Sequence, residues 1–255
     1  MLWLLFIFIF GFFGAIIFVF RARNPALHFS SSPSHVPGYK VPQHNINLVL
    51  VLGGGGARGL AHVGVLEEFE QAGIYPDFII GCSIGSIVGG LYCSGHSVSD
   101  IKDILLPLRR EDLLGQKNLN LRYGLHNGDK MREFLNKNLL VSEFEHLKKP
   151  LLCVATDLIH GHLLKIGTGP LAPAIQGSCA FPFLFRPVEW EGRLLVDGSV
   201  LNPVPANLAK HIAARLVVAV DISELLTVDM PNHLFGVARR TMEISYANQS
   251  KTHSQ

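Results

Sequence analysis

Two glycine-containing turns of this 255-residue chain each stand between an apolar run of strand length and a segment with helical periodicity. Leu48 to Leu52 is a continuous apolar run that leads into the turn Gly53 to Gly59. Phe78 to Ile80 is a second apolar run, and it leads into the turn Gly81 to Gly85. Uninterrupted apolar strands are typical of a parallel sheet that is buried on both faces. The sequence therefore predicts two successive units of strand, turn and helix.

The same alternation continues toward the C-terminus. Apolar runs predict further strands over Leu151 to Ala155, His162 to Ile166, Arg193 to Val196 and Leu216 to Val220. Helices are predicted near Ala172 to Gly177 and Val204 to Ala213, and residues 97–147 form a polar, helical insertion. This alternation predicts an α/β sandwich with a mostly parallel central sheet. The chain length suits one such domain, predicted at residues 46–225, with a helix and a polar tail over residues 226–255.

The first twenty residues contain no charged side chain. A helix of that length spans about 30 Å, which is the thickness of the hydrocarbon core of a bilayer, so we predict a transmembrane anchor over residues 1–20. A cleaved signal peptide is the alternative, but it needs a basic start, a shorter apolar run and a small-residue cleavage site, and none precedes Arg21. Because Arg21 and Arg23 follow the apolar segment, the downstream domain is predicted on the cytoplasmic side of the membrane.

Composition excludes several other classes of protein. Residues 21–45 are rich in Pro, Ser and His without an apolar period, which is typical of a flexible tether. With a formal net charge of +2 and only isolated basic pairs, the chain has no basic stripe for nucleic acid. The four cysteines form no close-spaced framework, which indicates a reducing compartment. No cysteine set or acidic loop has metal-ligand spacing, so we expect no metal and no cofactor.

The glycine-rich turn reads Gly-Gly-Gly-Gly-Ala-Arg-Gly and precedes a predicted helix. Glycines let successive backbone N–H groups point toward one spot, where the helix N-terminus adds partial positive charge. Such a turn binds a phosphate or the oxyanion of an acyl-transfer intermediate, although a purely structural turn is the simpler interpretation. A dinucleotide site needs an acidic residue after the second strand, where Ser83 stands instead. The candidate oxyanion-binding residues are Gly54, Gly55, Gly56, Ala57, Arg58 and Gly59.

The second turn is a Gly-x-Ser-x-Gly motif in the required context of strand, turn and helix. Its glycines permit a sharp turn that exposes the serine hydroxyl above the sheet edge. Ser83 is therefore the candidate nucleophile, and a helix N-cap is the other interpretation of this serine. The surrounding elbow consists of Gly81, Cys82, Ile84 and Gly85.

A serine nucleophile needs a base. None of the twelve histidines follows the last predicted strand, where the order Ser, Asp, His would place one. His62 lies in the first turns of the helix after the glycines, where packing or capping is expected. Asp197 directly follows a predicted strand, within Asp197-Gly198-Ser199, and is the candidate base. Taken alone, however, Asp-Gly is mostly a turn signal.

The order of glycine loop, Gly-x-Ser-x-Gly and Asp-Gly resembles the patatin-like phospholipases, whose catalysis uses a Ser-Asp dyad without histidine. Ser199 departs from the Gly or Ala of that family, and Cys179 stands where a Ser or Ala is common. Other segments are similar to the family, so the resemblance spans about residues 47–223: Ala155-Thr156-Asp157-Leu158, Ala174-Ile175, Phe181-Pro182, Asn202-Pro203 and Val217 to Asp221. The resemblance implies a three-layer α/β/α sandwich, and together with the anchor predicted at residues 1–20, which lies outside the resemblance, the chain is expected to be a membrane-anchored member of bacterial type.

The resemblance also implies a lipid acyl hydrolase of the phospholipase A or lysophospholipase type, with Ser83 as nucleophile and Asp197 as base. The expected partners are a membrane phospholipid or lysophospholipid and the lipid bilayer, with no nucleic acid. Two alternatives stay open. One is a histidine-dependent esterase of small esters, and the other is a membrane-anchored binding protein with an inactive hydrolase fold.

Overall fold

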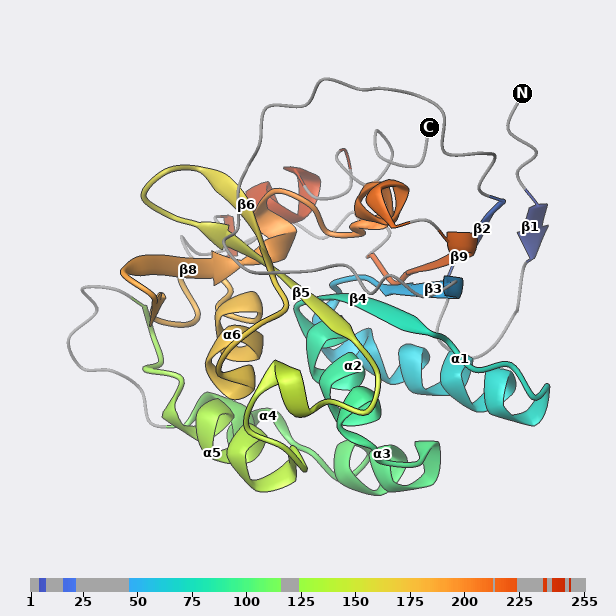
Figure 1. Ribbon diagram of the computed structural model, residues 1–255. Helices are drawn as coiled ribbons and strands as arrows, with labels where there is room; N and C mark the ends of the chain where they lie inside the picture. Colours follow the sequence, from blue (N-terminus) through green and yellow to red (C-terminus); the bar gives the residue numbers. More distant parts are fainter. Residues whose placement is uncertain are drawn as a thin grey trace.

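One mixed sheet organises the residues that the computed structural model describes, which are 5–7, 16–21, 46–115, 124–212, 214–223, 236–237, 240–245 and 248. Its strand order is β1-β2-β9-β3-β4-β5-β8-β7, and β6 pairs with β5 (Figure 1). The four central strands are parallel and almost wholly buried: β9 (Ala214–Asp221), β3 (Ile46–Leu52), β4 (Phe78–Cys82) and β5 (Leu151–Asp157). These are the apolar runs from which strands were predicted.

The flanking strands are antiparallel. On one side, β2 (Ile16–Arg21) pairs with β9, and β1 (Leu5–Ile7) pairs with β2. On the other side, β6 (His162–Ile166) and β8 (Arg193–Asp197) both pair with β5, and β7 (Val188–Trp190) pairs with β8. The prediction of a mostly parallel sheet is therefore right only for the centre. Short hairpin loops join β5 to β6 and β7 to β8, and such loops make neighbouring strands antiparallel.

The N-terminal segment differs from the predicted transmembrane helix where the structure describes it. Its described residues are the strands β1 and β2, while the rest of residues 1–20 and the predicted tether beyond Arg21 lie outside the described residues. No helix in the described part of the chain is long and apolar enough to cross a membrane. The β-branched and aromatic residues of Ile16–Arg21 suit a strand, and apolar content alone does not distinguish a strand from a helix.

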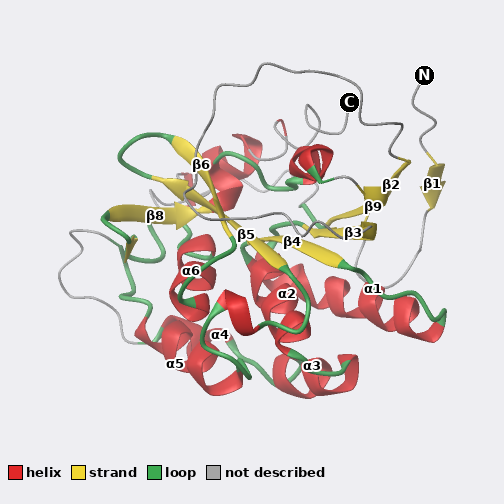
Figure 2. Ribbon diagram, in the orientation of Figure 1, coloured by secondary structure: helices red, strands yellow, loops and turns green. Residues whose placement is uncertain are grey.

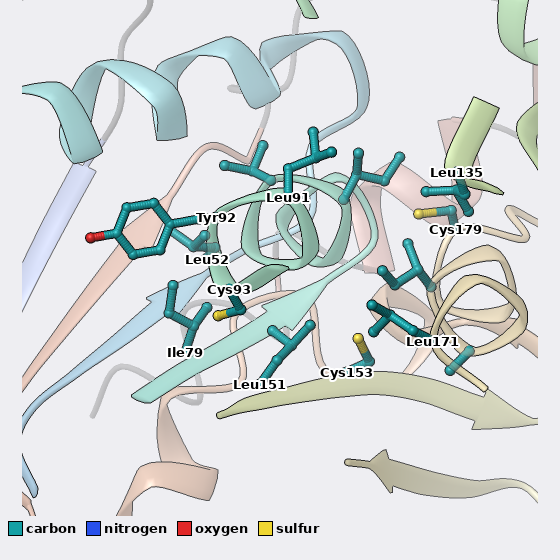
Figure 3. Close-up of a cluster of buried hydrophobic side chains, with 14 of the residues drawn as sticks. Leu52, Ile79, Leu91, Tyr92, Cys93, Leu135, Leu151, Cys153, Leu171 and Cys179 are labelled. Atoms are coloured by element: carbon teal, nitrogen blue, oxygen red, sulfur yellow. The ribbon is translucent and has the colours of Figure 1, made fainter. Parts of the chain in front are cut away.

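Helices α1 to α6 lie together on one face of the sheet, and the helical residues 240–245 near the C-terminus lie on its other side (Figures 1 and 2). Helix α2 is central in this layer, and its buried side chains join the apolar cluster drawn in Figure 3. The predicted insertion contributes three of the helices. The helices are α1 (Leu60–Gln71), α2 (Ile84–Ser94), α3 (Val98–Leu105), α4 (Arg110–Leu114), α5 (Asp129–Asn138) and α6 (Leu171–Ser178).

A second apolar cluster covers the opposite face of the sheet. There Val49, Val51 and Ile80 pack with Val204 and Leu208. This covering segment contains the 3-10 helix η4 (Ala206–His211), not the α-helix predicted over residues 204–213. The helical segment is only six residues long, and 3-10 helices commonly occur in such short pieces. The remaining 3-10 turns are η1 (Gly56–Gly59), η2 (Phe144–His146) and η3 (Gly198–Val200).

Candidate active site

Strand pairing brings the two chemically important turns together. β6 pairs with residues 153–157 of β5, whereas β4 pairs with residues 151–154 and β8 with residues 155–157. Because each strand has only two hydrogen-bonding edges, β4 and β8 must share the edge opposite β6. On that edge β4 ends at Cys82 beside Val154, and β8 ends at Asp197 beside Ala155. The ends of β4 and β8 therefore meet, although the two strands are far apart in the sequence.

Ser83 occupies the sharp turn between β4 and α2. Its backbone has φ 53° and ψ −124°, a conformation that a non-glycine residue rarely adopts and that is typical of functional sites. Helix α2 begins at Ile84 and packs closely on β3, because a Cβ atom at Gly85 would lie 2.1 Å from the carbonyl oxygen of Leu52. Ser83 is half-buried, so this residue is partly exposed to solvent.

Asp197 is the hydrogen-bond partner of this serine. The Ser83 hydroxyl donates to Oδ2 of Asp197 at 2.7 Å, and the amide of Ser199 donates to Oδ1 at 2.8 Å. The backbone of Asp197 is also held, since its amide donates to Ala180 O at 3.0 Å and its carbonyl accepts from the Thr156 hydroxyl at 3.1 Å. Both oxygens of the carboxylate therefore have fixed partners, and one of these partners is the candidate nucleophile.

The environment of Asp197 changes its acidity. The residue is 1% exposed, and this burial raises its pKa to about 6, although hydrogen bonds from Ser83 and Ser199 oppose the shift. Burial disfavours the charged form of a carboxyl group, so the ionised form becomes a stronger base. A carboxylate with a pKa near 6 is suited to general base catalysis close to neutral pH.

The glycine-rich loop lies against the dyad. A Cβ atom at Gly54 would be 3.4 Å from the Cβ of Ser83 and 2.2 Å from Oγ of Ser199, so a larger residue here would displace the Ser199 hydroxyl. The Gly54 amide donates to Pro203 O at 2.8 Å, and that hydrogen bond fixes the loop. The amide of Gly54, one of the candidate oxyanion donors, is therefore already used in a backbone hydrogen bond. Gly55 follows it, and Gly56, Ala57, Arg58 and Gly59 form η1 at the start of α1.

His62 supports the glycine-rich loop from α1. Its Nε2–H donates to Gly53 O at 2.7 Å, and burial lowers the pKa of the ring to about 4, which keeps it neutral at pH 7. This contact agrees with a packing or capping role. Within the described residues, the hydroxyl of Ser83 hydrogen-bonds the carboxylate of Asp197 and no histidine.

Ser178, at the end of α6, holds the nucleophile turn and was not identified from the sequence. Its hydroxyl accepts the Ser83 amide at 2.9 Å and donates to Val154 O at 2.6 Å. Because a hydroxyl has a single proton, the 2.8 Å contact with Ser86 must be a hydrogen bond donated by Ser86. Ser178 therefore uses its full hydrogen-bonding capacity to link the nucleophile turn with α2 and β5. No motif marks such a residue, which is recognised only from its contacts.

Ser178→Ala is expected to lower kcat for ester hydrolysis by about tenfold to a hundredfold, with little change in KM, because the turn that aims Ser83 loses its support. It also leaves Val154 O without its hydroxyl partner, at a cost of about 1 to 3 kcal/mol in stability. Steady-state kinetics and urea unfolding measure the two effects. Ser94→Ala is the control, since Ser94 is equally buried but bonds Leu91 O at the far end of α2. Equal kcat values for both variants would contradict the assigned role.

The two departures from the family pattern lie near the dyad. Ser199 contacts the Cys82 thiol through its hydroxyl at 3.4 Å, and its amide donates to Asp197 Oδ1 at 2.8 Å. Cys82 and Cys179 are buried, and this burial, together with the charge of Asp197, raises the pKa of each thiol. Ser199 thus stabilises the ionised base, while both thiols stay protonated.

The apolar stretch after Cys179 divides into buried and exposed side chains. Phe181 and Leu184 pack against the main core, and Phe185 is 7% exposed, so these residues belong to the fold. Phe183 is 53% exposed and has a φ of 68°. Across the described residues, no group of three or more His, Cys, Asp or Glu side chains is arranged to hold a metal ion.

The family profile described as Patatin-like phospholipase matches residues 50–210, which include the glycine-rich loop, the nucleophile turn and Asp197. The chain belongs to the patatin-like phospholipase family. Among its relatives, an uncharacterised NTE family protein from Mycobacterium tuberculosis is 32% identical over 177 residues, covering 69% of this chain and 49% of that protein. Patatin-like phospholipase domain-containing protein 6 from Homo sapiens is 30% identical over 192 residues, covering 73% of this chain and 14% of that protein.

This patatin-like chain therefore spans about half the length of its mycobacterial relatives and a small part of the human one. Among solved structures, VipD from Legionella pneumophila aligns with 76% of this chain and 49% of its own, with a TM-score of 0.48 and 16% identity. That likeness is too distant to support a statement about this chain.

Proposed function

We propose that this protein is a lipid acyl hydrolase that cleaves carboxylic esters of membrane phospholipids or lysophospholipids with Ser83 as nucleophile and Asp197 as base. The 2.7 Å hydrogen bond from the Ser83 hydroxyl to the Asp197 carboxylate carries this proposal. Family membership supports the reaction class, because the matching profile is that of a phospholipase. A membrane location of the chain, predicted from residues 1–20, stays a prediction.

The reaction proceeds through an acyl-enzyme. Ser83 Oγ attacks the ester carbonyl carbon while Asp197 Oδ2 takes the hydroxyl proton. The tetrahedral intermediate collapses, and Asp197 returns that proton to the departing alcohol oxygen. Water then attacks the acyl group and gives a proton to Asp197, the bond to Ser83 breaks, and the proton returns to Ser83. The products are a fatty acid and the deacylated lipid.

The oxyanion of both intermediates needs donors close to Ser83. We assign this role to the amides of Gly55, Gly56 and Ala57, at the turn that leads into α1, since the Gly54 amide already donates to Pro203. Gly54 contributes instead by having no side chain, which lets the loop approach the dyad. One well-placed donor lowers the barrier by about 3 to 4 kcal/mol.

Release of fatty acid from phospholipid vesicles tests the proposed function. Wild-type protein should release fatty acid and should be labelled at Ser83 by a fluorophosphonate, whereas Ser83→Ala should do neither, with a loss of at least about a thousandfold in rate. Ser94→Ala is the matched control and should behave as wild type. Equal rates from wild type and Ser83→Ala would contradict the proposal.

The rate should depend on the ionisation of Asp197. Since the base must be ionised and its pKa is raised to about 6, kcat/KM should rise about tenfold per pH unit below pH 6 and level off above it. Hydrolysis of a short-chain soluble ester measures this profile without any effect of vesicles. A rate that is unchanged down to about pH 4, near the usual pKa of aspartate, would show that the base does not have the raised pKa expected for buried Asp197.

The two alternatives have less support. A histidine-dependent esterase would need an imidazole beside Ser83, but the contact that the described residues supply is a carboxylate. An inactive binding protein would not need the strained serine turn with its buried, hydrogen-bonded base. Both the strained turn and the paired base favour an active hydrolase.

A further inference from the structure

The loop between β5 and β6 presents two apolar side chains to solvent. Leu158 is 50% exposed and Ile159 is 65% exposed, and they stand side by side in the sequence at the tip of this hairpin. Isolated exposed apolar residues are common, but a pair at the end of a projecting loop offers a contact surface. In Figure 1 this loop extends outward from the end of the sheet.

The tip is held rigidly. The buried carboxylate of Asp157 accepts hydrogen bonds from the backbone amides of Ile159 at 3.0 Å and His160 at 3.1 Å. It also accepts a hydrogen bond from Nδ1 of the His160 ring at 2.9 Å. Arg193 on the neighbouring strand donates to the same carboxylate at 2.8 Å. These bonds fix the loop backbone, so Leu158 and Ile159 stay in exposed positions.

The hairpin tip and the candidate active site lie at the same end of the central strands, where β4 and β5 finish. β5 runs parallel to β4, so its end at Asp157 points in the same direction as the turn that carries Ser83. Ala155 pairs directly with Asp197, and Leu158 follows three residues later, which is about 10 Å along an extended chain. A membrane or protein surface that binds the hairpin tip would therefore lie close to Ser83 and Asp197.

The charges on the hairpin suit an anionic surface. Residues 158–166 contain no Asp or Glu but include His160, His162 and Lys165. Asp157 is buried and paired with Arg193, so it presents no free negative charge at the tip. Glu189 on β7, which pairs with β8 and not with the hairpin itself, lies 4.0 Å from Arg186. An exposed apolar pair in a segment with a lysine at residue 165 and no acidic side chain matches the acyl region and the anionic headgroups of a bilayer.

We propose that Leu158 and Ile159 insert into the surface of a lipid bilayer that contains anionic lipid, and so hold the active site against its substrate. The purpose of this contact rests on the proposed lipid hydrolase function. The insertion itself is measurable without catalysis.

A fluorescent probe at the tip tests insertion directly. Ile159→Cys, in the Ser83→Ala background, is labelled with an environment-sensitive fluorophore and mixed with vesicles of phosphatidylcholine and phosphatidylglycerol. The four native thiols are buried and react poorly, because burial raises the pKa of each one. Leu106→Cys is the control, since Leu106 is 60% exposed and follows α3.

The probe at residue 159 should brighten and shift to shorter wavelength on addition of vesicles, while the probe at residue 106 should not change. No response at residue 159, or the same response at both positions, would overturn the proposal, even if another part of the chain binds the vesicles. A response to the anionic vesicles that persists equally with pure phosphatidylcholine would overturn the role of anionic lipid.

Kinetics separate docking from chemistry. The double variant Leu158→Ser, Ile159→Ser should lower hydrolysis of vesicle lipid by at least about tenfold and leave hydrolysis of a short-chain soluble ester unchanged. The control is Leu106→Ser, Leu140→Ser, which removes two apolar side chains of similar exposure elsewhere. Unchanged vesicle hydrolysis, or an equal fall on both substrates, would overturn docking by the tip. If wild type cleaves no ester, the proposed function fails, and the fluorescent probe still decides whether the tip inserts.

Discussion

Asp197→Asn should lower the rate of ester hydrolysis by about a thousandfold or more while the protein stays folded. The amide is similar in size and its oxygen can still accept from the Ser199 amide, but it cannot take the proton of Ser83. Hydrolysis of a soluble short-chain ester and circular dichroism measure the two properties. Asp77→Asn is the control, because Asp77 accepts backbone amides of residues 47 and 48 at the start of β3, at the opposite edge of the sheet.

The same substitution should stabilise the protein at neutral pH. The pKa of Asp197 is raised from 3.8 to about 6 in the folded state, so the folded state binds more protons than the unfolded state between about pH 4 and 6. Stability therefore falls as pH rises through that window, and the cost is fully present above pH 6. Removing the charge should raise the free energy of unfolding at pH 7 by about 2 to 3 kcal/mol and give little benefit below pH 4. Urea unfolding at both pH values measures this difference.

A variant that keeps wild-type activity would show that Asp197 is not the base. Loss of activity accompanied by loss of stability at pH 7 would point instead to a structural role for the carboxylate.

Gly85→Ala is expected to destabilise the fold by about 3 kcal/mol or more. Its new Cβ would lie 2.1 Å from Leu52 O and 2.6 Å from Leu52 C, and neither is a side-chain atom that can rotate away. Helix α2 would have to move away from β3, and the nucleophile turn would move with it, so activity should fall as well. Thermal or urea unfolding and ester hydrolysis measure these effects.

Gly64→Ala is the matched control for this substitution. Gly64 lies within α1, and a Cβ atom there would meet nothing within 4 Å. Alanine favours the helical conformation, so this variant should be more stable by about 0.5 to 1 kcal/mol. If Gly85→Ala and Gly64→Ala gave the same change in unfolding free energy, the close approach of α2 to β3 would not limit this position.

Local pattern was sufficient for much of the architecture, and it singled out the serine and the aspartate whose side chains hydrogen-bond in the structure. The apolar runs at Leu48 to Leu52 and Phe78 to Ile80 predicted β3 and β4, because side chains in these strands are buried on both faces. The motif around Ser83 predicted a sharp turn, and the structure has one. Such features depend on neighbouring residues, which a sequence displays directly.

Contacts between distant segments could not be predicted in this way. Ser178 bonds the amide of Ser83 across 95 residues, and nothing in the order of residues marks that pairing. The hydrogen bond from Gly54 to Pro203 likewise shows only in the fold. Strand direction is a further example, because an apolar run favours a buried strand but does not identify its neighbours, and β8 runs antiparallel to β5.

The amino-acid sequence by itself determined the alternation of strands and helices, the two glycine-containing turns and the identity of the serine and aspartate that face each other. Only the tertiary structure decided how those two residues meet. β4 runs parallel to β5 and β8 runs antiparallel to it, along the same edge, so Cys82 and Asp197 end beside the consecutive residues Val154 and Ala155. The physical reason is that a strand has two hydrogen-bonding edges, and β6 already occupies the other one.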